Sequence, residues 1–170
     1  MQINRIHDWY DKYHHDIYNY IFYMLGDHEQ AKDLMQDTFV RAYHSFDSFH
    51  GGEEKAWLVR IARNITIDYI RKQKPIAYMF DWSKPLLANV KTPEQISILN
   101  EREKELYQAL QKLKNSYREV IILRKIKELS IKETAVILDW SENKVKVQLF
   151  RALKALKKEL QKGGFMHEQF

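Results

Sequence analysis

A chain of 170 residues is long enough to bury a hydrophobic core, as one domain or as two small ones. Its composition, 45% hydrophobic and 30% charged, is typical of soluble globular proteins, and no apolar run approaches the roughly 20 residues needed to cross a bilayer. The absence of cysteine excludes disulfides and thiolate metal sites. The first residues lack the basic-then-apolar layout of a signal peptide, so we expect a cytoplasmic protein that is not embedded in a membrane.

The charge is unevenly distributed along the chain. Although the formal net charge is +5, residues 1–50 contain four basic residues against eight acidic ones. Residues 60–74 contain five basic residues and one acidic residue, and residues 141–162 contain seven and two. Separate basic clusters suit contact with nucleic-acid phosphates, because each neutralised phosphate releases a condensed counterion. Charge alone leaves open that these clusters are only solvated helix faces.

The first half of the chain contains three segments whose apolar residues recur at helical spacing. The predicted helices span residues 3–25, 28–43 and about 53–72. The first ends at Gly26-Asp27, and a break around residues 46–52 separates the second from the third. No segment is a convincing strand, so the sequence predicts an all-helical protein.

Residues 75–93 contain all three prolines of the chain. Proline lacks a backbone donor and pushes the residue before it out of the helical region, so this segment interrupts the helices. We predict two small helical domains, residues 1–74 and 94–162, joined by a linker over 75–93 and followed by a flexible tail over 163–170.

Helical spacing resumes in the second half, over residues 93–113, 116–126, 130–138 and 141–160. Ser130 and Glu133 fit a capping box, in which each side chain satisfies an orphan backbone donor of the other residue. Asp139 tolerates the left-handed backbone conformation, and Ser141 can cap the helix that follows. A short helix, a tight turn and a longer basic helix predict a helix-turn-helix.

The last predicted helix has an apolar stripe opposite a basic face. The stripe consists of Val145, Leu149, Ala152, Leu153, Leu156 and Leu160. Val147 lies in the middle of the basic face, where a membrane-surface helix would not place it, but where it could contact a thymine methyl in a DNA major groove. A coiled coil needs several sustained heptads, and Gly163-Gly164 ends the helix too soon. These residues therefore favour a helix that enters the major groove of DNA.

Motifs in both halves of the chain resemble parts of one known protein family. The segment ELSIKETAVILDWSENKVKVQLFRALKAL, with the preceding residues 110–123, resembles the C-terminal promoter-reading domain of bacterial RNA polymerase sigma factors of the extracytoplasmic-function group. AKDLMQDTFVRAY, residues 31–43, is similar to the polymerase-binding helix of that family. WLVRIARNITIDYIRK, residues 57–72, is similar to its helix that reads and opens the minus-10 element. The match covers about residues 6–74 and 105–160, and the lack of a large segment between the domains resembles the minimal two-domain group.

The resemblance implies a sigma factor that binds core RNA polymerase and directs promoter-specific transcription initiation. It would read the minus-35 duplex with its second domain and capture the melted minus-10 strand with its first. The implied partners are core RNA polymerase, promoter DNA and a membrane-bound anti-sigma factor. We expect no enzymatic activity, cofactor or metal, because the sequence has no glycine-rich phosphate loop, no nucleophile motif and no histidine at metal-ligand spacing.

The predicted helix over residues 28–43 has an acidic polar surface, which suits a basic protein partner and would repel DNA. Two apolar residues of this helix, Leu34 and Phe39, are as consistent with a core position as with a partner contact. The residues predicted to bind core polymerase are Asp33, Leu34, Gln36, Asp37, Phe39 and Arg41.

Aromatic, basic and glycine residues are mixed over residues 46–64. Aromatic surfaces beside cations can hold unstacked bases, and Gly51-Gly52 could close on a flipped base, although Trp57 is spaced largely as a core residue. Asn64 can pair with a base edge, and the resemblance implies DNA contacts for it and for His50 and Arg71. The residues predicted to contact minus-10 DNA are Phe49, His50, Trp57, Arg60, Arg63, Asn64 and Arg71.

The outward residues of the last helix divide into two predicted groups. Those near its N-terminal end meet base edges, and those a turn or more along meet the phosphate backbone. The residues predicted to contact minus-35 DNA are Asn143, Lys144, Lys146, Val147, Gln148, Arg151 and Lys154. The chain departs from the residues frequent in the family at Asn143-Lys144, Gln148 and Asp139-Trp140, which bears on the promoter sequence rather than on the fold.

Two other classes of protein are alternatives. A stand-alone dimeric helix-turn-helix regulator with a helical sensor domain predicts tight, specific binding of duplex DNA by the isolated protein, and it does not explain the acidic helix. An RNA- or membrane-associated helical adaptor explains neither motif.

Overall fold

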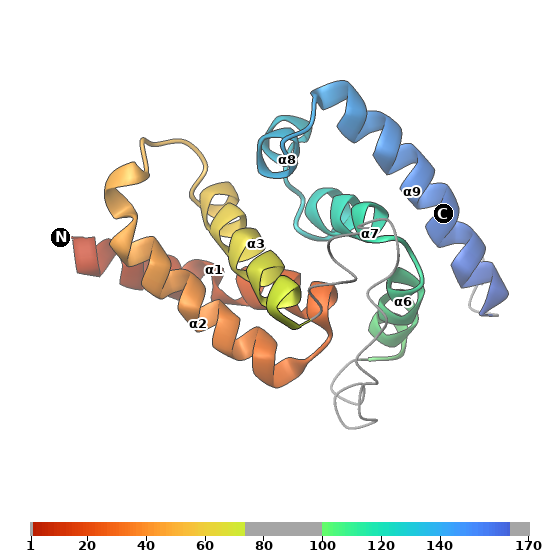
Figure 1. The fold of residues 1–170 in the computed structure, drawn as a ribbon, viewed down its shortest axis with the longest axis horizontal. Coiled ribbons are helices and arrows are strands. Elements are labelled where there is room, and N and C mark those ends of the chain that lie inside the picture. Colours follow the sequence, from red (N-terminus) through yellow and green to blue (C-terminus); the bar gives the residue numbers. More distant parts are fainter. Residues whose placement is uncertain (1, 74–99, 164–170) are drawn as a thin grey trace. The chain divides into compact units, whose positions relative to one another are not determined.

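The computed structural model describes residues 2–73 and 100–163, and the regular elements in these ranges are all helices (Figure 1). The chain divides into two compact units, Met1–Pro75 and Ile76–Phe170, which we call unit 1 and unit 2. The predicted all-helical class is confirmed. The predicted linker over residues 75–93, and the predicted tail beyond residue 163, lie outside the described residues.

Unit 1 contains three α-helices that each pack against the other two. They are α1 (Gln2–Leu25), α2 (His28–His44) and α3 (Glu54–Gln73), and a short 3-10 helix, η1 (Phe46–Ser48), follows α2. Each helix buries an apolar stripe, whose fully buried members include Ile17, Tyr20, Ala31, Ala42, Leu58 and Ala62. The observed bounds differ from the predicted ones by no more than one residue at either end, because the apolar spacing that predicts each helix is also what it buries.

The turn between α1 and α2 consists of the two residues predicted to make it. Gly26 has a φ of 68°, a left-handed conformation that glycine adopts at little cost, and its N–H donates to the Phe22 carbonyl at 2.6 Å. Asp27 is extended, and its side chain accepts a hydrogen bond from the Gln30 N–H at 3.1 Å. These two residues therefore end one helix and cap the next without a longer loop.

Unit 2 is assembled around its last helix. Its elements are α6 (Glu101–Gln111), α7 (Asn115–Ile121), the π-helical segment η2 (Ile122–Ile126), α8 (Ile131–Leu138) and α9 (Glu142–Lys162). The helix α9 packs against α6, α7 and α8. Its predicted apolar stripe faces them, with Val145, Ala152, Leu156 and Leu160 buried and the two remaining leucines half-buried.

A buried arginine joins α6 to α7. The side chain of Arg118 is fully buried, and its Nε donates to the Leu110 carbonyl at 3.0 Å and its Nη2 to the Gln111 carbonyl at 3.2 Å. These carbonyls belong to the last turn of α6, where the helix runs out of its own donors, so the guanidinium caps that helix. Burial lowers the pKa of Arg118 to about 10, which leaves the cation intact at neutral pH.

The predicted helix over residues 116–126 is helical throughout, but its last five residues form the π-helical η2. The Lys127 N–H donates to the Ile122 carbonyl at 2.8 Å, and Glu128 then adopts a left-handed φ of 57°. The wider helical turn and the left-handed residue redirect the chain toward Ser130, which starts the next helix.

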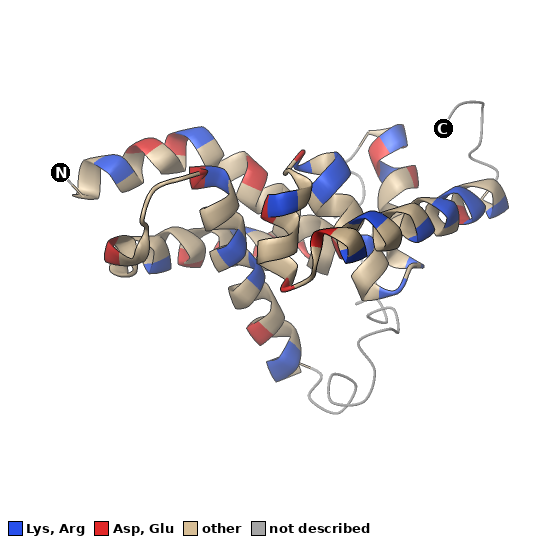
Figure 2. Ribbon diagram, turned by 90° about the horizontal axis from the view of Figure 1, so that it is seen from above, with Lys and Arg blue, Asp and Glu red and all other residues tan. Residues whose placement is uncertain are grey.

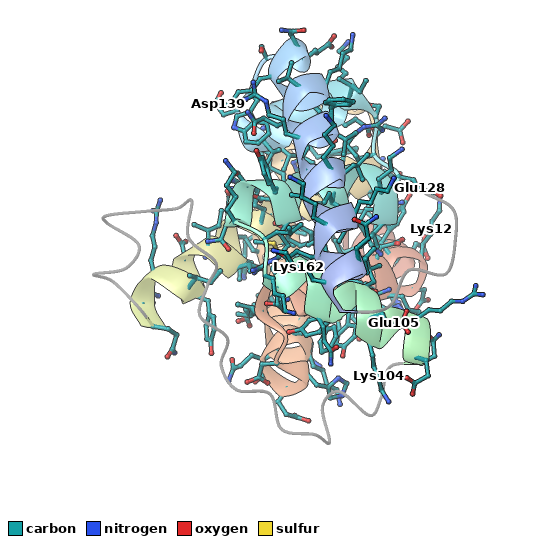
Figure 3. The ribbon with its side chains drawn as sticks, turned by 90° about the vertical axis from the view of Figure 1, so that its right-hand side faces the viewer. Lys12, Lys104, Glu105, Glu128, Asp139 and Lys162 are labelled. Atoms are coloured by element: carbon teal, nitrogen blue, oxygen red, sulfur yellow. The ribbon has the colours of Figure 1, made fainter. Side chains whose placement is uncertain are left out.

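The predicted helix-turn-helix is confirmed, and its turn has the predicted chemistry. Ser130 Oγ accepts from the Glu133 N–H at 3.0 Å, and a Glu133 carboxylate oxygen accepts from the Ser130 N–H at 2.8 Å. Asp139 is left-handed, with φ 56° and ψ 45°, and Ser141 Oγ accepts from the Lys144 N–H at 3.1 Å. Figure 3 shows Asp139 beside the N-terminal end of α9 and Lys162 at the opposite end of that helix. The turn thus fixes where α9 begins and the direction in which it leaves α8.

Candidate nucleic-acid and polymerase interfaces

The helix α2 presents a polar face of mixed charge. Asp33, Gln36, Asp37 and Arg41 are exposed, and their spacing places them on one side of the helix. Leu34 and Phe39, which the sequence also assigned to polymerase binding, are only 7% and 5% exposed. They belong to the core of unit 1 and hold the helix in place. The four polar side chains therefore make up the surface that these predicted residues offer to a partner.

A groove of about 790 Å³ lies between α2 and α3 beside this polar face. Asp33, Asp37 and Asp68 line it, together with Arg41 and Lys72. Carboxylates and cations that share one open groove suit a protein partner whose surface also carries both charges.

A second groove, of about 420 Å³, lies between α1 and α2 and is lined almost entirely by apolar groups. Ile3, Val40 and Tyr43 line it and are 64%, 57% and 37% exposed. Exposed apolar clusters of this kind often mark interaction sites. None of the three is among the predicted site residues, although the sequence contains one signal: Val40 follows Asp33 and Gln36 at helical spacing, as an apolar residue in a polar face.

Four aromatic residues form a cluster where η1, the following loop and the start of α3 meet α1. Trp9 is 3% exposed and lies at its centre. The ring centroid of Trp9 is 5.8 Å from that of Phe46, 5.0 Å from that of Phe49 and 5.7 Å from that of Trp57. Phe49 and Trp57 are themselves 5.2 Å apart, and both are half-buried. The structure thus brings the two predicted minus-10 aromatics together and adds Trp9, which is not among the predicted site residues.

The loop after Phe49 is open to solvent. His50, Gly51 and Gly52 are exposed, and the two glycines have φ values of 93° and 91°. A Cβ at either glycine would have nothing within 4 Å, so the backbone conformation, not lack of space, requires glycine there. The loop therefore has room to approach a ligand closely.

One face of α3 continues from this loop. Arg60, Asn64 and Arg71 are exposed, and with Trp57 they recur at the spacing of a single helical face. Arg63 is half-buried and lies to one side of that face. The predicted minus-10 residues are thus brought together on the aromatic cluster, the loop and one side of α3.

The exposed side of α9 is basic. Figure 2 shows Lys and Arg recurring along this helix with few acidic residues between them. Asn143, Lys144, Val147, Arg151 and Lys154 are exposed on the side opposite the buried stripe. By the same helical geometry, Lys146 and the half-buried Gln148 lie at the two edges of this face.

Aromatic side chains accompany the lysines of this face. The Lys144 Nζ lies 4.7 Å from the centroid of Trp140, and the Lys154 Nζ lies 4.9 Å from that of Phe150. Phe150 is 63% exposed and Val147 is 38% exposed. Phe150 was not among the predicted site residues. It directly follows Leu149 of the apolar stripe, and the sequence pattern assigns it neither to that stripe nor to the basic face.

Neither a metal site nor a membrane span has support in residues 2–73 and 100–163. No group of three or more His, Cys, Asp or Glu side chains in these ranges could hold a metal ion. Across the same residues, no helix combines the length and the apolar character needed to cross a membrane.

A three-helix unit followed by a helix-turn-helix unit with a basic outer face defines the class of protein: an all-helical transcription factor. Within this class, the family models Sigma-70 region 2 and Sigma-70 region 4 match residues 9–76 and 103–156. The ECF RNA polymerase sigma factor SigX of Bacillus subtilis is 40% identical over 158 residues, which cover 89% of this chain and 81% of SigX. SigW of the same organism is 36% identical over 163 residues, which cover 90% of this chain and 87% of SigW.

The chain belongs to the ECF RNA polymerase sigma factors and contains sigma-70 regions 2 and 4. It directs promoter-specific transcription initiation with RNA polymerase, as an initiation factor that is not itself an enzyme. The family resemblance and the function predicted from it are confirmed. A stand-alone helix-turn-helix regulator would leave region 2 unexplained.

Solved structures share this fold. The sigma factor RpoE of Bartonella quintana, in complex with the anti-sigma factor NepR, aligns with a TM-score of 0.70 at 25% identity, covering 91% of this chain and 97% of that one. CnrH, in complex with the cytosolic domain of CnrY, aligns with a TM-score of 0.69 at 24% identity, covering 93% and 88%.

Proposed function

We propose that this sigma factor divides its work among three surfaces, of which the exposed face of α2 binds core RNA polymerase. Asp33, Gln36, Asp37 and Arg41 make the polar part of this contact, and Leu34 and Phe39 support it from the core. Val40 and the apolar groove beside it supply the apolar part. Protein interfaces usually combine an apolar centre with a polar rim, and the carboxylates select a basic partner surface.

The melted minus-10 strand binds at the loop of residues 49–52 and along the adjoining face of α3. Phe49 and Trp57 pack against Trp9 and are half-buried, so each is supported from the core and keeps part of its ring exposed. Stacking of one base on such a side chain contributes roughly 1–3 kcal/mol. His50 and Asn64 meet base edges, and Arg60, Arg63 and Arg71 attract the strand's phosphates.

The minus-35 duplex receives α9 in its major groove. The observation that carries this assignment is the exposed basic face of α9, which begins at the Ser141 cap and lies opposite the buried stripe. Asn143, Lys144, Val147 and Gln148, in the first two turns, meet base edges, with Lys146 at the margin of the contact. Arg151 and Lys154, farther along, meet phosphates.

An anti-sigma factor anchored in the membrane is the third proposed partner, besides core polymerase and promoter DNA. The solved complex of the related RpoE with the anti-sigma factor NepR supports an anti-sigma factor as a partner, and the membrane anchor is what the family resemblance implies. The sigma factor itself works in the cytoplasm, because the polymerase and the promoters that it serves are there.

Transcription by purified core RNA polymerase of Bacillus subtilis tests the assignment of the three surfaces. With a library randomised over both promoter elements, the chain should enrich one two-part promoter, and only in complex with core polymerase. Asn64→Ala should alter initiation through the minus-10 element alone, and Lys144→Ala through the minus-35 element alone. If either variant affects the other element, or if the chain without core polymerase binds the enriched duplex equally well, this division of the surfaces is wrong.

A further inference from the structure

The guanidinium of Arg5, near the start of α1, lies over the aromatic cluster. Its Cζ is 5.2 Å from the ring centroid of Trp9, 5.7 Å from that of Phe46 and 5.4 Å from that of Phe49. All three distances are within the range in which the electron-rich face of a ring attracts a cation. Arg5 therefore covers Phe46 and Phe49, which lie just before the loop and at its start, and Trp9, which packs against both.

The same guanidinium also reaches the residue at which the loop ends. An Arg5 Nη2 lies 3.7 Å from a carboxylate oxygen of Glu54, the first residue of α3. The other carboxylate oxygen of Glu54 accepts a hydrogen bond from the Tyr13 hydroxyl at 3.2 Å. An exposed ion pair is worth little alone, but this carboxylate is held by two residues of α1, so its position is fixed. Arg5 thus contacts both ends of the loop.

The segment between these contacts is the one that must meet DNA. His50, Gly51, Gly52 and Glu53 are exposed, and the two glycines give the backbone a wide choice of conformations. A loop that orders only when it binds loses affinity to the entropy of ordering, whereas a loop held beforehand does not. The half-exposed Arg5 side chain is placed to provide this restraint from outside the loop.

We infer that Arg5 is a positioning residue for capture of the minus-10 strand. It holds the aromatic side chains at the start of the loop and Glu54 at its end, so that His50 and the glycines are presented in one conformation. This inference rests on the proposed role of the loop and of α3. Arg5 needs no contact with a base for this role, and it acts through Phe46, Phe49 and Glu54.

Two variants separate the charge of Arg5 from its bulk. Arg5→Met keeps a long apolar stem over the rings but removes the cation, and Arg5→Lys keeps a cation that can lie over one ring and reach Glu54. Lys12→Met is the matched control, because Lys12 also lies on α1 and interacts with Glu54, while its own ring contact is with Tyr13, outside the cluster.

The measurement is binding of a fluorescent single-stranded oligonucleotide by the reconstituted holoenzyme. The oligonucleotide is the non-template minus-10 strand of the promoter enriched by the unaltered protein. Arg5→Met should weaken its binding roughly three- to tenfold, Arg5→Lys by less than that, and Lys12→Met by no measurable amount. Permanganate reactivity of the opened promoter should fall in the same order. Affinity for core polymerase and the thermal midpoint should match those of Lys12→Met, since a purely structural defect would change them too.

Equal strand binding by Arg5→Met and Lys12→Met would overturn the inference. So would a loss of strand binding that only parallels losses of core affinity and thermal stability. Asn64→Ala, measured in parallel, distinguishes this failure from a failure of the proposed site. If Asn64→Ala weakens strand binding and Arg5→Met does not, only the role of Arg5 is wrong. If neither variant weakens it, the strand binds elsewhere and both assignments are wrong.

Discussion

At the scale of single residues, Lys144 and Lys154 have similar surroundings and different positions. Each ammonium lies less than 5 Å from the centroid of an aromatic ring, Trp140 for the first and Phe150 for the second. The ring restrains the long side chain and leaves the charge free for an anion. Lys144 is in the first turn of α9 and Lys154 is beyond its middle, so the two should meet different parts of the DNA.

This difference makes the direction of α9 testable. With holoenzyme on a minus-35 library, Lys144→Ala and Gln148→Ala should each cost roughly 1–3 kcal/mol on the preferred sequence and relax preference at one or two positions. Lys154→Ala should weaken binding to all sequences alike and reduce the slope of log affinity against log salt by about one. The proposed orientation is wrong if Lys154→Ala changes the preferred sequence while the other two variants keep it.

At the scale of elements, α2 performs two tasks with its two sides. Its inner side, including Leu34, Phe39 and Ala42, is buried, and its outer side exposes the carboxylates of Glu29, Asp33 and Asp37. Because the two sets of side chains do not overlap, the outer side can change with little effect on folding. Surface substitutions away from caps and buried networks usually alter stability by less than about 0.5 kcal/mol.

We therefore expect Asp33→Lys combined with Asp37→Lys to abolish association with core polymerase in an otherwise folded protein. The reason is that two cations would replace two carboxylates opposite a basic partner surface. Co-elution with core polymerase and thermal unfolding measure the two effects. Asp8→Lys combined with Asp11→Lys, on the exposed side of α1, makes the same change in charge and should leave association intact. Normal holoenzyme assembly by a well-folded Asp33/Asp37 variant would remove α2 from the interface.

At the scale of the whole molecule, the chain consists of two units with separate cores, and the two proposed promoter contacts are divided between them. Asn64 lies in unit 1 and Lys144 in unit 2, and no side chain belongs to both sites. Substitutions that share no partner usually have additive free-energy effects.

The double variant Asn64→Ala/Lys144→Ala should therefore lower promoter-dependent initiation by the sum of the two single effects, within about 0.5 kcal/mol. Initiation rates on the enriched promoter at limiting holoenzyme give the three free energies that are compared. A larger departure from additivity would mean that the two promoter elements are read as one coupled site.

Most of the fold could be predicted from the sequence, because the signals involved are local. Helical spacing predicted the bounds of α1, α2 and α3 to within a residue, and Gly26-Asp27, Ser130-Glu133 and Asp139 act at the turns as their side chains and backbone preferences require. The π-helical end of the helix before α8 was not predictable, since the same residues have an ordinary helical pattern.

The sequence by itself determined which segments are helical, the caps at Ser130 and Ser141, and which side chains recur on one face. These properties depend on neighbours three or four residues away. Only the tertiary structure decided that Leu34 and Phe39 face inward, that Val40 and Phe150 remain exposed, and that Arg5 and Trp9 meet Phe49. The last of these contacts joins residues about 40 positions apart. Such a pairing depends on how α1 packs against the other helices of unit 1, and no local spacing encodes it.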